Sequence, residues 1–94
     1  MSKQSKAGVG PLARAVAAEV RAEMARQEMT GIELSRVTGL SNNYLARRLR
    51  GEFPFTLNDL EPVASALRVS PAELFSRGMD ASRRAAMDAD DDEK

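Results

Sequence analysis

Cysteine, histidine and tryptophan are all absent from this 94-residue chain. Without cysteine, neither a disulfide framework nor a cysteine-based zinc site is possible. Without histidine, the commonest general base and the commonest metal ligand are both missing. The sequence also has no glycine-rich phosphate-binding loop. These absences predict that the protein is not an enzyme and that it uses no cofactor and no metal.

Long hydrophobic runs are absent too. The longest apolar stretches span a few residues, whereas a transmembrane helix needs about 20. Lys3 and Lys6 near the N-terminus are not followed by an apolar core, so this segment does not read as a secretory signal. We therefore expect a cytoplasmic protein with no membrane partner.

Aromatic residues are scarce, with one tyrosine and three phenylalanines. The apolar residues make up 43% of the chain and are mostly alanine, leucine, valine and methionine. This composition favours packed helices over a β-sandwich. The length predicts a single domain with one modest core.

The formal net charge is zero, but the charges are unevenly distributed. Lysines mark the N-terminal segment, and residues 79–94 are acidic. Residues 30–51 carry four arginines against Glu33 alone: Arg36, Arg47, Arg48 and Arg50. A basic segment of this kind indicates binding to nucleic acid, although a solvated helix face is the plainer interpretation of a charge run.

Helix signals recur along the chain. Pro11 suits a first helical position, and apolar residues then recur every four positions, which predicts a helix over 11–28. N-capping residues precede four further apolar patterns: Thr30, Ser41, Thr56 and Ser70. They predict helices over about 30–37, 41–50, 56–67 and 70–77.

Glycines punctuate these helices. We expect Gly39, Gly51 and Gly78 to end helices in the left-handed conformation. Pro62 lies inside the fourth pattern and indicates either a kink or a looser preceding turn. The predicted organisation is a flexible basic arm (1–10), a helical domain (11–78) and an acidic, part-helical tail (79–94).

The segment Thr30–Gly51 has the plan of a helix-turn-helix, with a short helix, a turn at Gly39-Leu40-Ser41 and a second short helix. Leu34, Leu40 and Leu45 are placed to hold the two helices at a fixed angle. Ser41 caps the second helix, so that its first turn projects outward.

These residues resemble the Cro/C1-type family, also called XRE or lambda-repressor-like, over about residues 12–78. The segment from Leu67 to Phe75 is similar to the usual end of that family's domain. The resemblance implies an all-α, compact five-helix fold whose second motif helix enters the major groove. By position it implies base reading by Asn42, Asn43 and Arg47 and phosphate contacts by Thr30 and Arg50.

Further phosphate contacts are expected from Ser41, Arg48, Lys3 and Lys6. Two roles stay open for Tyr44: its ring lies in the core, or its hydroxyl donates to a phosphate. The sequence departs from the family pattern at Gly31, Ser35 and Arg48, and Met24 and Leu49 stand where many members carry an ion pair. We expect Met24 and Leu49 to make an apolar contact in its place.

The predicted function is that of a sequence-specific double-stranded DNA-binding transcriptional regulator, either a phage immunity repressor, a Cro-like protein or a small bacterial regulator. Two alternatives stay open: an antitoxin of a toxin–antitoxin pair, and a protein-interaction adaptor that retains the fold. We expect no small-molecule effector. We also expect a homodimer, preformed or assembled only on DNA, with Leu74, Phe75 and Met79 at its interface.

Overall fold

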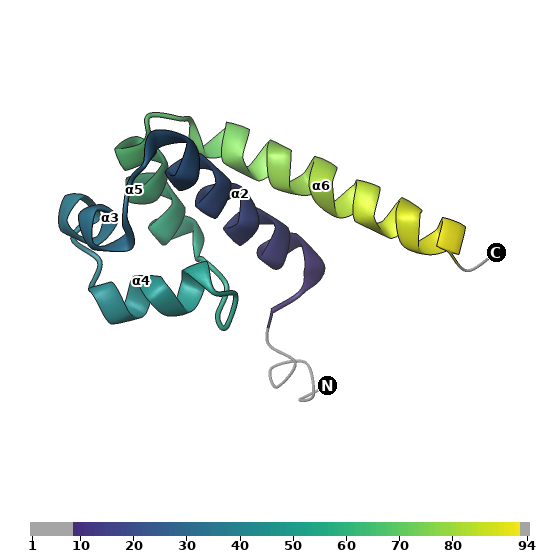
Figure 1. The fold of residues 1–94 in the computed structure, drawn as a ribbon, viewed down its shortest axis with the longest axis horizontal. Coiled ribbons are helices and arrows are strands. Elements are labelled where there is room, and N and C mark those ends of the chain that lie inside the picture. The colour runs from purple at the N-terminus through teal and green to yellow at the C-terminus, as the bar shows by residue number, and fades with distance from the viewer. Residues whose placement is uncertain (1–8, 93–94) are drawn as a thin grey trace.

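The computed structural model describes residues 9–92, with side chains up to Asp88. Within this range the chain forms helices and no strand (Figure 1). The predicted all-α, five-helix fold is confirmed. Its elements are α2 (Pro11–Gln27), α3 (Gly31–Thr38), α4 (Asn42–Leu49), α5 (Leu57–Leu67) and α6 (Pro71–Asp92).

Side-chain caps explain where four of these helices begin, among them α6, where the Ser70 hydroxyl accepts a hydrogen bond from the Glu73 amide. The Thr30 hydroxyl accepts a hydrogen bond from the Glu33 amide, and the Glu33 carboxylate accepts one from the Thr30 amide. The same reciprocal capping box joins Thr56 to Asp59 at the start of α5. At α4 the Ser41 hydroxyl accepts from the Tyr44 amide. Because these hydrogen bonds join residues only three positions apart, the helix starts can be predicted from the sequence.

The core lies where α2, α3, α4, α5 and the first turns of α6 meet. Met24 belongs to this core, and Leu49 packs against the core from a partly buried position. A direct contact between these two side chains stays a prediction. The fully buried large side chains are Val20, Leu34, Leu45, Val63, Leu67 and Leu74. Helix α5 continues through Pro62, which lies inside it.

The last helix corrects the sequence prediction. Gly78 does not end a helix, because α6 runs on to Asp92 without interruption and the predicted domain boundary at residue 78 falls inside it. Gly78 is buried against α2: a Cβ added there would lie 2.6 Å from Cγ2 of Val16 and 3.2 Å from its Cα. The glycine therefore allows two helices to approach closely, and we call the contact between α2 and α6 the α2–α6 seam.

An ionic cluster also ties this seam together. The Glu23 carboxylate accepts hydrogen bonds from Arg26 and Gln27 on its own helix and from Arg77 of α6, at 3.0 Å. Gln27 also donates to the carbonyl of Leu67. Hydrogen bonds from Gln27, Arg26 and Arg77 lower the pKa of Glu23 from 4.5 to about 2.

Candidate nucleic-acid interface

Helices α3 and α4 are joined by the tight turn that the motif requires. Gly39 ends α3 with a φ of 82°, a conformation that favours glycine. The Ser35 hydroxyl donates to the Leu40 carbonyl at 2.6 Å, which fastens the turn to α3. The turn therefore fixes the direction in which α4 leaves α3.

Helix α4 is anchored at both ends. In its first turns, Leu45 is fully buried in the core, and the Tyr44 hydroxyl donates to the carboxylate of Asp59 on α5 at 3.0 Å. At its last residue, the Arg21 guanidinium of α2 donates to the carbonyl of Leu49. Because that carbonyl has no partner within the helix, the Arg21 bond satisfies it and links α4 to α2.

The opposite face of α4 is open to solvent. Asn42, Asn43, Arg47 and Arg50 are all exposed. Residues 43, 47 and 50 are spaced by four and three positions, so they share one face of the helix. Figure 1 shows α4 at the edge of the molecule away from α6. The structure therefore exposes all three predicted base-reading residues, with Asn43 and Arg47 on one face and Asn42 at the first position of α4.

Arg48, a predicted phosphate contact, and Tyr44, for which two roles were open, are turned inward instead. The Arg48 guanidinium stacks on the Tyr44 ring at 3.5 Å from its centroid and lies 3.9 Å from the Asp59 carboxylate. Its side chain is only 17% exposed. The hydrogen bond to Asp59 raises the pKa of Tyr44. Tyr44 and Arg48 thus connect α4 with α5 and lie off the open face.

The remaining predicted phosphate contacts lie near the ends of α3 and α4. Thr30 and Ser41 are exposed, and each hydroxyl already caps its own helix. Arg50 is 57% exposed in its side chain. Lys3 and Lys6 lie outside the described residues.

The sequence interpretation missed Glu52 at this site. Its carboxylate pairs with Arg50 at 2.8 Å and with Arg47 at 3.5 Å. The hydrogen bond from Arg50 lowers the pKa of Glu52, so the carboxylate is ionised at neutral pH. The available signal was the Gly51 helix terminator, which sets the next residue just beyond the end of α4.

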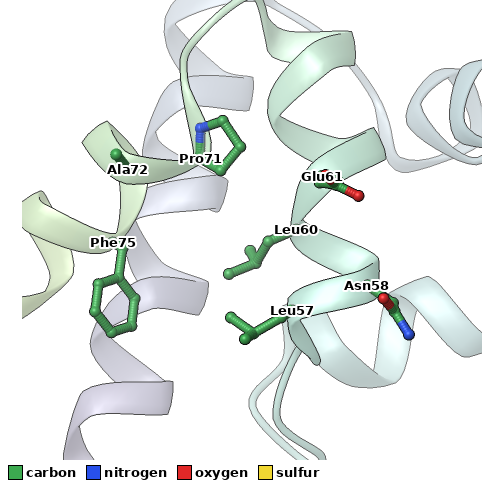
Figure 2. A pocket seen from close by; sticks show the side chains of 7 residues that line it. All are labelled: Leu57, Asn58, Leu60, Glu61, Pro71, Ala72 and Phe75. Atoms are coloured by element: carbon green, nitrogen blue, oxygen red, sulfur yellow. The ribbon is translucent and has the colours of Figure 1, made fainter.

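On another face of the molecule, a predicted dimer contact needs correction. Leu74 is completely buried in the core of the monomer, so its side chain is not available to a second copy. Phe75 and Met79 are exposed by 37% and 46%. Phe75 borders an apolar pocket of about 550 Å³ between α5 and α6, and Leu57 faces it from α5 (Figure 2).

None of the helices in the described range is long and apolar enough to span a membrane.

A short helix, a glycine turn and a capped second helix with an open polar face define a helix-turn-helix DNA-binding transcriptional regulator. The chain belongs to the BetR domain family, which matches residues 13–91. Membership in this class of regulators agrees with the prediction from composition that the chain is not an enzyme.

Solved structures support the same conclusion. The crystal structure of the clp gene regulator ClgR from Corynebacterium glutamicum is similar with a TM-score of 0.77 and 26% identity, over 84% of this chain and 84% of that one. A second ClgR structure gives a TM-score of 0.69 and 27% identity over 74% of this chain and 91% of that one. A comparison with curated proteins finds no match. The predicted helix-turn-helix resemblance is confirmed.

Proposed function

We propose that this chain is a sequence-specific regulator that represses transcription by occupying an operator in duplex DNA. The observation that supports the proposal most strongly is the open face of α4, where Asn42, Asn43 and Arg47 project from a helix anchored at both ends. A rigidly held helix is suited to recognition because the side chains it presents keep their register on the DNA.

The proposed base contacts follow from the chemistry of these side chains. The major groove is about 12 Å wide and admits one α-helix. An asparagine amide can pair with N6 and N7 of adenine, and a guanidinium with O6 and N7 of guanine. We assign base reading to Asn42 and Asn43 at the start of α4 and to Arg47 one turn later.

The proposed phosphate contacts flank this face. Arg50 offers an exposed guanidinium, and Thr30 and Ser41 lie at helix N-termini, whose free amides favour an anion. Tyr44 and Arg48 are proposed to hold α4 in position through Asp59. Contacts by Lys3 and Lys6 stay a prediction from the sequence.

A second copy of the chain is the proposed partner on DNA. One α4 spans only a few base pairs, and helix-turn-helix proteins extend the site by placing two such helices about 34 Å apart. The exposed apolar side chains Leu57, Phe75 and Met79 supply a surface for that copy.

Met79→Glu should then weaken self-association and operator affinity while leaving thermal stability unchanged. Sedimentation with and without operator, together with a melting curve, measures these effects, and Met87→Glu is a control farther along α6. An unchanged operator complex would exclude this interface.

Selection of bound sites from random duplex DNA tests the recognition claim. After a site is obtained, Arg47→Ala should cost about 1–3 kcal/mol on that site and relax preference at one base position. Arg50→Ala should weaken binding to selected and random duplexes alike and lower the slope of affinity against salt concentration by about one unit. Arg84→Ala removes an equal charge from α6 and should change neither the affinity nor the salt slope.

Two results would contradict the proposal. Equal losses of affinity on both duplexes for Arg47→Ala would make Arg47 a phosphate contact. No effect from any variant on this face would remove α4 from DNA binding. Placing the selected site across a promoter in a purified transcription reaction tests repression: transcript levels should fall as the protein is added, and a rise would contradict repression.

A further inference from the structure

The carboxylate of Glu52 engages both arginines that the proposed function assigns to DNA. It lies 2.8 Å from Nε of Arg50 and 3.5 Å from Nε of Arg47. All three side chains are about half exposed: 46% for Glu52, 57% for Arg50 and 44% for Arg47. One carboxylate thus neutralises much of the positive charge on the open face of α4, at the place where phosphates would bind.

The backbone fixes Glu52 in this position. Gly51 is left-handed, with a φ of 82°, and its amide donates to the Arg48 carbonyl at 3.1 Å. The Glu52 amide donates to the Arg47 carbonyl at 2.9 Å. These two bonds form a Schellman motif, in which the residue after the glycine is held just beyond the last turn of the helix.

This location is electrostatically unfavourable for an unpaired carboxylate. The C-terminal end of a helix carries partial negative charge, so Glu52 would be repelled there without a cationic partner. Arg47 and Arg50 supply that partner. Arg47 is further held by the Phe53 ring, whose centroid lies 4.8 Å from its guanidinium carbon. The two side chains that hold Arg47, those of Glu52 and Phe53, therefore both belong to the segment that follows α4.

A DNA complex requires the arginines to exchange this carboxylate for DNA. Phosphate and guanine oxygens would compete with the carboxylate of Glu52 for the same guanidinium groups. Breaking these ion pairs reduces the binding free energy on every duplex, whatever its sequence. The carboxylate of Glu52, left near the DNA phosphates, also repels them.

We propose that Glu52 is an internal competitor for DNA, which lowers affinity for all duplexes by pairing with Arg47 and Arg50 in the free protein. This inference rests on the proposed function. It assigns to Glu52 the role of limiting retention on non-operator DNA, since a regulator of this class meets a large excess of such sites.

The test compares Glu52→Gln with the wild-type chain on random and selected duplexes at several salt concentrations. We expect Glu52→Gln to bind both duplexes about two- to tenfold more tightly at low salt, from the energies typical of two exposed ion pairs. The salt slope should steepen by up to about one unit. Glu73→Gln is the matched control, because Glu73 is similarly exposed and pairs with Arg77 at 2.6 Å on α6, which makes no contact with α4. It should leave DNA affinity unchanged.

A double-mutant cycle separates competition from simple repulsion. If Glu52 acts by pairing, Glu52→Gln should raise DNA affinity much less in an Arg47→Ala, Arg50→Ala background than in the wild-type background. The comparison is made at low salt, where weak binding is detectable. An equal gain in both backgrounds, or no gain in the wild-type background, would overturn the inference. Failure of the wild-type chain to bind any duplex would instead overturn the proposed function, so the two failures are distinguishable.

Discussion

Helices α4 and α6 are held in the fold by different kinds of interaction. Helix α4 has one fully buried side chain, Leu45, and its other described attachments include polar ones, from Arg21 to its last carbonyl and from Tyr44 to Asp59. The first turns of α6 are held by the buried Leu74 and by the close approach of Gly78 to Val16. The α2–α6 seam is therefore mainly an apolar contact, with one ionic cluster at its edge.

The difference follows from what each helix presents to solvent. A short helix that exposes a polar recognition face can bury little apolar surface, so directional hydrogen bonds must set its orientation. Since an apolar contact contributes to stability roughly in proportion to the area buried, α6 can stabilise the domain without facing DNA. Changes at the α2–α6 seam should consequently affect stability, and changes around α4 should affect DNA binding.

The largest expected effect on stability is at the core position of α6. Leu74→Ala should lower the free energy of unfolding by about 2–5 kcal/mol, because it leaves a cavity beneath a fully buried side chain. Chemical denaturation at several protein concentrations measures the loss. Met79→Ala on the exposed side of the same helix is the control. A Leu74→Ala protein of normal stability that fails only to self-associate would restore Leu74 to a dimer interface.

A smaller loss is expected where α2 and α6 approach most closely. Gly78→Ala should cost about 1–3 kcal/mol, because the new Cβ would overlap Cγ2 of Val16 and crowd its backbone. The control is Gly31→Ala, where an added Cβ meets no atom within 4 Å. Thermal melting distinguishes the two variants. Equal melting temperatures would mean that the helices can separate without cost.

The ionic cluster at the seam should make stability depend on pH. The pKa of Glu23 is about 2 in the folded protein against 4.5 ordinarily, so the unfolded chain takes up this proton first as the pH falls. The contribution is complete above about pH 5 and is lost toward pH 2, amounting to about 1–2 kcal/mol after allowance for solvent screening. Denaturation of the wild-type and Glu23→Gln proteins between pH 7 and pH 2 should show two curves that converge in acid. Parallel curves would show that Glu23 contributes nothing specific.

The smallest expected stability effect is at the polar anchor of α4. Tyr44→Phe should cost about 1 kcal/mol, because it removes the hydrogen bond to Asp59 while keeping the ring under Arg48. It should nevertheless weaken binding to a selected site more than Gly78→Ala does in the fraction that remains folded. Affinity measured on both variants makes the comparison. The reverse order would mean that the hydroxyl does not orient α4.

Local signals account for most of what the sequence could predict. The caps at Thr30, Ser41 and Thr56 act within a few residues, and the helices they predicted agree closely with α3, α4 and α5. The exposed side of α4 was predictable because the motif fixes Leu45 as its inward residue. These inferences need no knowledge of distant partners.

Most of the misses depended on residues far away in the sequence, whereas Glu52 was missed although its partners, Arg47 and Arg50, lie within five residues of it. Gly78 has the appearance of a helix terminator until Val16 is placed against it. Tyr44 could not be assigned between core and surface because its partner, Asp59, lies on another helix. Leu74 and Phe75 are adjacent in the sequence, and only the packing of α6 decides which of them is buried.

The most direct test of the central claim is a titration of the labelled protein with a selected duplex, followed by amide chemical shifts. The account predicts that the largest changes occur at Asn42, Asn43 and Arg47, with flanking changes at Thr30 and Arg50. Changes concentrated instead on Leu57, Phe75 and Met79, with α4 unaffected, would contradict it, because DNA would then bind the apolar face and not the open face of α4.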